Sequence, residues 1–144
     1  MSVGQFVFML HSHLPYYRKA GMWPFGEENL YECMAETYIP LLNAISELYD
    51  EGIKAKLTVG ITPILAEQLN DQHLKEGFVK YVDSRIAQVS KDLERYPDPK
   101  VPHSQHLKYL AKYYFDWFTN IKNSFVNKYG MDLIAQFKKF QDLG

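Results

Sequence analysis

The sequence predicts an α/β fold in which two parallel strands are separated by helices, with a helical excursion after the second strand. Two short apolar runs, residues 5–10 and 55–61, have the length and composition of strands in a parallel sheet. Between and after them, apolar residues recur every three or four positions, as in amphipathic helices. Because a sheet typically has about five or six strands, we expect these residues to be the amino-terminal part of a larger α/β barrel or open sheet.

The first predicted strand leads into a long loop. The run from Gln5 to Leu10 is apolar after its first residue, which favours a strand buried on both faces. Residues 13–26 contain prolines and glycines among aromatic residues, and this composition interrupts any helical or strand period. We therefore expect an ordered loop, and such loops tend to carry function.

A helical segment is predicted between the two strands. Glu27 and Glu28 suit its N-terminus, where the helix dipole favours negative charge. The apolar face extends to residue 48, and Pro40 within it predicts a kink or two abutting helices. Gly52 is placed to end the segment, and the second buried strand is expected over residues 55–61.

Only helices are predicted after the second strand. Their ranges are 64–69, 73–96, 104–129 and 131–140, and prolines between residues 97 and 102 separate the two longest. One face of the 104–129 helix is expected to pack in the core, and it carries Leu107, Leu110, Tyr114, Trp117, Ile121 and Phe125.

Composition and charge exclude several classes of function. Sixteen Lys and Arg against 17 Asp and Glu give a net charge of −1. The chain therefore lacks the excess of positive charge that binding to nucleic acid or anionic lipid requires. No apolar run approaches the roughly 20 residues that cross a bilayer, so no membrane partner is expected. The lone Cys33 favours buried packing and a reducing compartment, which makes the cytoplasm the expected location.

A His-x-His pair follows the first predicted strand. In an extended segment, residues two apart point the same way, so His11 and His13 are able to converge on one ligand. Three interpretations stay open, namely two structurally satisfied histidines, substrate binding, and a shared metal ion. A zinc site needs three or four protein ligands, and a complete metal site is not expected because no ligand spacing links the pair to His73, His103 or His106.

The loop and the helix start offer further candidate residues. Trp23 and the neighbouring aromatic residues have two interpretations. They line a pocket and stack on sugars, or they pack the loop back against the rim of the barrel. The residue pair His103 and His106 is expected to cap a helix or face solvent. The acidic residues are expected to form a solvated helix face rather than a pair of catalytic carboxylates, and they are Glu27, Glu28, Glu32 and Glu36.

Several segments together carry a family resemblance. Residues 8–16 read FMLHSHLPY, residues 23–28 read WPFGEE, and residues 35–42 read AETYIPLL. With residues 56–69, they resemble the amino-terminal region of glycoside hydrolase family 57, and within it the 1,4-α-glucan branching enzymes. The resemblance implies part of an incomplete (β/α)7 barrel that acts on α-1,4-glucan with retention and without a metal or other cofactor.

The resemblance also implies site residues. His11 and His13 match the family's first signature region, close to the scissile sugar, and Trp23 matches an aromatic position near the glucan cleft. The family's catalytic Glu and Asp lie on later strands and match no acidic residue here. We therefore expect residues 1–144 to be a partial catalytic domain that needs the remainder of the domain and is inactive alone.

Other functions stay open at this point. Within the same family, an α-amylase or a 4-α-glucanotransferase is the alternative to a branching enzyme. Outside catalysis, it would be a glucan-binding remnant that keeps the aromatic loop. A metal-dependent hydrolase using His11 and His13 is the remaining alternative.

Overall fold

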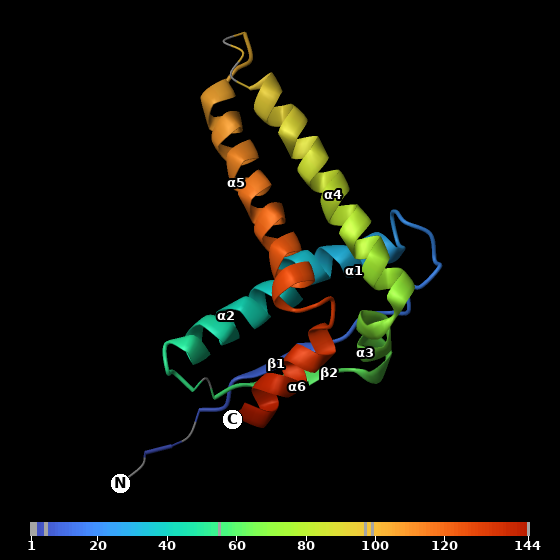
Figure 1. Ribbon diagram of the computed structural model, residues 1–144, viewed down its shortest axis with the longest axis vertical. Helices are drawn as coiled ribbons and strands as arrows, with labels where there is room; N and C mark the ends of the chain where they lie inside the picture. The colour runs from blue at the N-terminus through green and yellow to red at the C-terminus, as the bar shows by residue number, and fades with distance from the viewer. Residues whose placement is uncertain (1–2, 5, 55, 97, 99, 144) are drawn as a thin grey trace.

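A pair of parallel strands and a set of helices make up the fold (Figure 1). The computed structural model describes residues 3–4, 6–54, 56–96, 98 and 100–143. In chain order, the elements are β1 (Met9–Ser12), α1 (Glu27–Cys33), the π-helix η1 (Met34–Tyr38), α2 (Ile39–Asp50), β2 (Thr58–Ile61), α3 (Pro63–Asn70), α4 (Gln72–Arg95), α5 (Ser104–Asn123), the π-helix η2 (Ser124–Lys128) and α6 (Leu133–Leu143).

The two strands pair in parallel. Met9 lies opposite Thr58 and Ser12 lies opposite Ile61, so the carboxyl ends of β1 and β2 meet at one edge. The helical segment from α1 to α2 connects them, which is the crossover that a parallel pair requires. The prediction of two parallel strands separated by helices is confirmed.

The first strand is shorter, later and more exposed than predicted. Strand β1 begins at Met9 rather than at residue 5, which lies outside the described residues. The expectation of burial on both faces is wrong, because Met9 is 66% exposed and residues 6–8 are exposed as well. Burial on both faces requires a packed layer over each face of a sheet. Within the described part of the chain, no such layer covers residues 6–9. Strand β2 is half-buried and begins at Thr58, and residue 55, where the strand was predicted to begin, lies outside the described residues.

Pro40 marks the junction of two helical segments, as predicted. It lies in the first turn of α2, directly after the π-helix η1. A proline has no backbone N–H, and its ring excludes the carbonyl four residues earlier, so an α-helix cannot continue through it unchanged. The wider π turn accommodates this position. Helix α2 then ends at Asp50, and Gly52 takes the left-handed conformation with φ 77°.

The core lies where α1, η1, α2, α3 and α4 meet the end of α5, the π-helix η2 and the start of α6. Phe78 and Phe125 pack edge to face with ring centroids 4.8 Å apart. Other fully buried side chains of this core are Leu30, Tyr31, Met34, Ile39, Leu42, Leu65, Leu69, Leu74 and Leu133.

Helices α4 and α5 form a hairpin that projects from the body (Figure 1). The 104–129 helix was predicted to pack along one face, and this face becomes less buried away from the body. Leu107, Leu110 and Trp117 are half-buried, and Ala111 is buried. Ile121 and Phe125 are buried, whereas Tyr114 is 48% exposed because it lies on the projecting part. Helix α5 also ends earlier than predicted, at Asn123, and η2 follows it.

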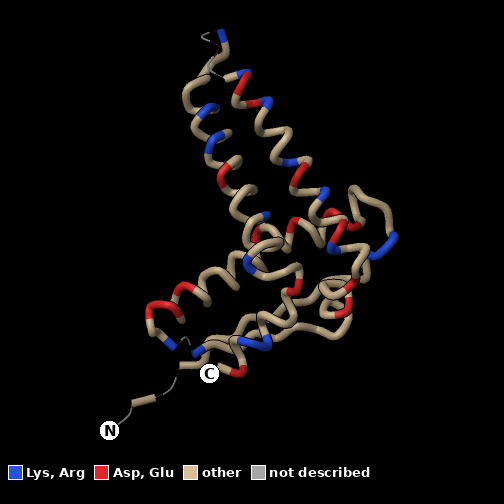
Figure 2. Tube along the Cα trace, viewed as in Figure 1, with Lys and Arg blue, Asp and Glu red and all other residues tan. Residues whose placement is uncertain are grey.

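Charged residues of both signs are interspersed along α4 and α5 (Figure 2). This distribution agrees with the net charge of −1. Among the described residues, no helix is long and apolar enough to cross a membrane.

Candidate functional site

The carboxyl ends of the two strands place the His-x-His pair at one edge. His11 lies opposite Gly60, and a Cβ on Gly60 would lie 3.4 Å from His11 Nδ1, so the imidazole lies over the glycine. The Ser12 carbonyl accepts a hydrogen bond from the Thr62 N–H at 3.1 Å, which ties the two strand ends together. This edge is therefore ordered, and the His11 side chain is exposed on it.

Polar groups at this edge have unused hydrogen-bonding capacity. His11 and His13 are exposed. Thr62 Oγ1 is buried and has no hydrogen-bond partner within the described part of the chain. No three His, Cys, Asp or Glu side chains of that part gather as a metal site would require. Strand ends of α/β folds are where ligands bind, so this edge is a candidate binding site.

The loop of residues 13–26 is held against the segment that follows β2. Gln68 of α3 is only 1% exposed and makes two hydrogen bonds to the loop backbone. Its Oε1 accepts from the Tyr17 N–H at 2.6 Å, and its Nε2 donates to the Pro15 carbonyl at 2.9 Å. The expectation of an ordered loop is confirmed, and Gln68 is one cause of the order.

Asp71 provides a second attachment for the loop. One of its oxygens accepts from Arg18 Nε at 2.6 Å, and the other accepts from the Leu74 N–H at 3.1 Å as the N-cap of α4. Burial raises the pKa of Asp71, but the Leu74 and Arg18 hydrogen bonds outweigh it and hold the pKa below its usual range. The carboxylate is thus ionised at neutral pH and joins the loop to α4.

Asp71→Ala is expected to destabilise the fold by about 1–2 kcal/mol, because it removes an N-cap together with the loop attachment. Asp71→Asn keeps the cap oxygen and loses only the ion pair, so it is expected to retain most of the stability. Urea denaturation at pH 7 measures both. Equal losses for the two variants would show that the charge on Asp71 matters more than the cap.

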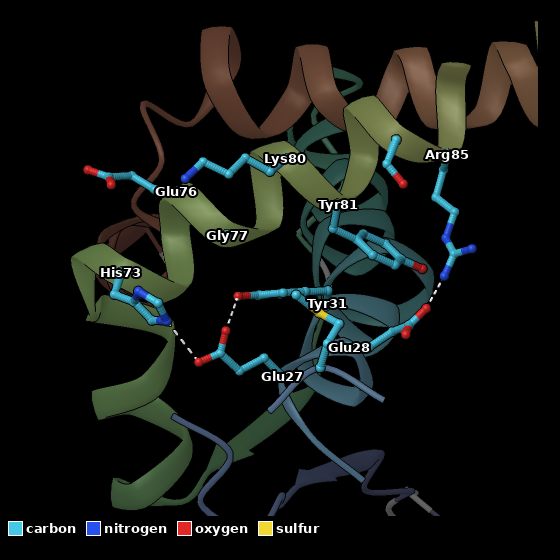
Figure 3. Close-up of a pocket in the computed structure, with 11 residues that line it drawn as sticks. Glu27, Glu28, Tyr31, His73, Glu76, Gly77, Lys80, Tyr81 and Arg85 are labelled. Carbon is cyan, nitrogen blue, oxygen red and sulfur yellow. Dashed lines mark hydrogen bonds and ion pairs between the residues drawn. The ribbon is translucent and has the colours of Figure 1, made fainter. Parts of the chain in front are cut away.

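Glu27 provides the third attachment, at the start of α1 (Figure 3). Its Oε1 accepts from the Lys19 N–H at 2.7 Å and lies 2.8 Å from His73 Nε2, and its Oε2 accepts from the Tyr31 hydroxyl at 3.0 Å. Burial raises the pKa of Glu27, but these hydrogen bonds outweigh it and lower the pKa below its usual value.

The expectation of a solvated acidic face is therefore wrong at its first two positions. Glu27 is only 6% exposed, and the half-buried Glu28 pairs with Arg85 of α4. Glu32 and Glu36 are exposed as expected. Glu27 and Glu28 are less exposed than Glu32 and Glu36 because α4 packs across the start of α1. Helix α4 supplies His73 as a partner of Glu27 and Arg85 as a partner of Glu28.

A pocket of about 420 Å³ lies between α1 and α4, next to Glu27 (Figure 3). Met22 of the loop reaches it, whereas His11, His13 and Trp23 do not line it. The structure thus leaves the predicted residues on two surfaces, with the histidines at the strand edge and Trp23 78% exposed on the loop. The pocket residues are Met22, Glu27, Glu28, Tyr31, His73, Glu76, Gly77, Lys80, Tyr81, Ser84 and Arg85.

Two smaller expectations are confirmed, because Cys33 packs against the core, and His103 and His106 face solvent. Cys33 is half-buried, and this burial raises the pKa of its thiol, in keeping with a packing role. His103 occupies the N-cap position of α5, but its side chain makes no capping hydrogen bond. Its backbone is left-handed with φ 58°, whereas an N-cap side chain bonds to its helix from a typically extended backbone.

Residues 7–144 match the family model of Glycosyl hydrolase family 57. The chain belongs to glycosyl hydrolase family 57. It is 38% identical over 143 residues to the 1,4-alpha-glucan branching enzyme TK1436 of Thermococcus kodakarensis, a match that covers 98% of this chain and 20% of that enzyme. This family membership confirms the resemblance seen in the sequence.

Two solved structures have the same fold over this region. The GH57-type branching enzyme of Pyrococcus horikoshii matches with a TM-score of 0.86 and 38% identity, over 96% of this chain and 25% of that one. The alpha-amylase AmyC of Thermotoga maritima matches with a TM-score of 0.81 and 32% identity, again over 96% and 25%. The chain therefore spans about a quarter of the length of these structures.

Proposed function

We propose that residues 1–144 are the amino-terminal part of the catalytic domain of an α-glucan branching enzyme. In this proposal, the complete domain is an incomplete (β/α)7 barrel that cleaves α-1,4 linkages and forms α-1,6 linkages with retention. The observation that carries it is the 38% identity to a 1,4-alpha-glucan branching enzyme over 98% of the chain. The remainder of the domain is the partner that this portion requires.

Within the proposed enzyme, His11 and His13 bind the glucan beside the reacting sugar, and Trp23 stacks on a neighbouring sugar. The position of His11 at a strand carboxyl end supports this role, because α/β enzymes bind substrates there. The buried and unpartnered Thr62 Oγ1 supports it too, since native folds rarely leave such a group without a partner and its partner here would come from outside the described residues. The exposed ring of Trp23 supplies an open aromatic face.

The proposed chemistry needs carboxyl groups that this portion does not provide. Retaining cleavage uses two carboxyl groups roughly 5 Å apart, one as nucleophile and one as acid and base. Glu27 already accepts hydrogen bonds from Lys19 and Tyr31, and Glu28 is paired with Arg85. The family resemblance implies a catalytic Glu and Asp on later strands, and we therefore assign the nucleophile and the acid to those strands of the domain.

The test uses the native polypeptide that carries residues 1–144, captured from its own cells with an antibody against this chain. We expect an intact mass well above 16.9 kDa, and new α-1,6 linkages after incubation with amylose, measured by enzymatic debranching. His11→Ala is expected to lower kcat/KM about tenfold through loss of substrate positioning. The 144-residue chain alone is expected to make no branches. Branching by this chain alone, or full activity of the His11 variant, would contradict the proposal.

A second candidate within the family is plain α-glucan cleavage. The similarity to the alpha-amylase AmyC, with a TM-score of 0.81, supports this second candidate. A branching enzyme and an alpha-amylase both contain the fold of this region. Product analysis separates the two. Shorter linear chains without α-1,6 linkages would establish hydrolysis or 4-α-glucan transfer, whereas binding without turnover that Trp23→Ala abolishes would establish a glucan-binding role.

A further inference from the structure

We propose that Glu27 is a positioning residue that fixes the loop carrying Trp23 through its bonds to Lys19 and His73. The inference rests on the proposed function, because it assigns Trp23 to glucan binding. Glu27 itself is only 6% exposed and has no role in contacting the sugar. Its effect passes through the backbone of residues 19–22.

The carboxylate holds a strained point of the loop. Lys19 has φ 61°, a left-handed conformation that is uncommon for a residue with a side chain. Such a conformation persists only when its surroundings fix it. The charge-assisted hydrogen bond from the Lys19 N–H to Glu27 at 2.7 Å supplies that fixation, since it is stronger than a neutral one.

The backbone on both sides of Trp23 is fixed by the same helix start. The Glu27 N–H donates to the Gly21 carbonyl at 2.9 Å, and the Glu28 N–H donates to the Met22 carbonyl at 3.2 Å. On the other side, Asn29 Nδ2 donates to the Pro24 carbonyl at 3.2 Å. Trp23 is therefore an exposed ring on an ordered backbone, which is the arrangement of a preformed binding platform.

His73 of α4 and Tyr31 of α1 together hold the carboxylate in place. His73 Nε2 lies 2.8 Å from Glu27, and the buried Tyr31 hydroxyl fixes the other oxygen at 3.0 Å. The remaining charged groups of the pocket are Glu28, paired with Arg85, and Glu76 and Lys80 on α4. Because the pKa of Glu27 is lowered, the attachment is complete above the ordinary carboxyl pKa of about 4.5 and is lost as the pH falls through the lowered pKa of the folded state.

A fixed loop lowers the cost of ordering Trp23 when glucan binds. Releasing the loop therefore weakens substrate binding, while the chemical step that follows binding stays unchanged. The expected signature is a rise in KM with kcat preserved, which a general loss of folding would not produce.

The decisive experiment is Glu27→Gln in the native polypeptide, with His73→Ala as a second variant. Glu27→Gln keeps the side-chain volume and removes the charge, and His73→Ala changes a half-exposed side chain that the core does not need. Amide hydrogen exchange at residues 17–22 is expected to rise about tenfold in both, with KM for amylose up several-fold and kcat within about twofold. Glu36→Gln, an exposed carboxylate on η1, is the matched control and is expected to change neither.

The outcomes separate the two proposals. Unchanged exchange at residues 17–22 in both variants overturns the positioning role, and so does faster exchange with an unchanged KM. If Glu27→Gln raises exchange throughout the chain, that variant has lost its fold. The exchange at residues 17–22 and the KM of His73→Ala then decide whether the positioning role holds. A parent polypeptide without activity on amylose refutes the proposed function, and the exchange data then still establish or refute Glu27 as the residue that fixes the loop.

Discussion

Gly77→Ala is expected to destabilise the fold by about 2–3 kcal/mol, although alanine favours an α-helix more than glycine does. A Cβ at Gly77 would overlap the Tyr31 hydroxyl and lie 2.8 Å from its Cζ. The Tyr31 ring is fully buried with the Phe78 and Tyr81 rings 6.2 Å and 5.7 Å away, so moving it away from α4 would disturb this packing. Displacing it would also break the hydrogen bond to Glu27. Urea denaturation monitored by circular dichroism measures the loss.

A double-mutant cycle identifies the cause. Tyr31→Phe removes the overlapping hydroxyl and is expected to cost about 1 kcal/mol, because it leaves Glu27 with one donor fewer. In the Tyr31→Phe background, Gly77→Ala is expected to be markedly less destabilising than in the parent. A gain of about 1 kcal/mol from Gly77→Ala in the parent would instead show ordinary helix propensity, and it would refute the close packing of Tyr31 against α4.

The local pattern of the sequence predicted the elements but not how the strands are covered. Helical periodicity is a property of neighbouring residues, so the segments before and after Pro40 were predictable, as was the α4–α5 pair. Strand burial depends on the layers that pack over a strand, which the sequence of that strand does not contain. Met9 is exposed for this reason, despite its apolar run.

The site was predictable only in part because its contacts join distant residues. The His11 position followed from strand ends and the family motif. The hydrogen bonds of Glu27 to His73 and of Gln68 to Pro15 connect residues 46 and 53 positions apart, and no local spacing encodes them. Gly77 offered an overlooked signal, because a glycine inside a helical pattern usually has a packing reason. It marks the place where Tyr31 crosses α4.

The second large effect is expected from Gln68→Glu, which changes one atom type at a buried position. Gln68 donates from Nε2 to the Pro15 carbonyl and accepts from the Tyr17 N–H through Oε1. A carboxylate would still accept from Tyr17, but it would place a charged oxygen against the Pro15 oxygen with no proton between them. Burial of an unpaired charge in this way is expected to cost about 3 kcal/mol or more at pH 7.

The loss from Gln68→Glu is expected to shrink in acid. Burial and the facing carbonyl raise the pKa of the new carboxyl in the folded state above its unfolded value of about 4.3. The folded state then binds the proton more tightly than the unfolded state, so the stability difference from the parent falls as the pH decreases through the raised pKa. Once protonated, the carboxyl donates to the Pro15 carbonyl as the amide did.

Urea denaturation of variant and parent at matched pH values measures this difference in stability. The control is Gln88→Glu at an exposed position, and it is expected to stay within about 0.5 kcal/mol of the parent. A pH-independent loss would mean that Gln68→Glu acts through packing alone, and an unchanged stability at pH 7 would mean that Gln68 does not hold the loop.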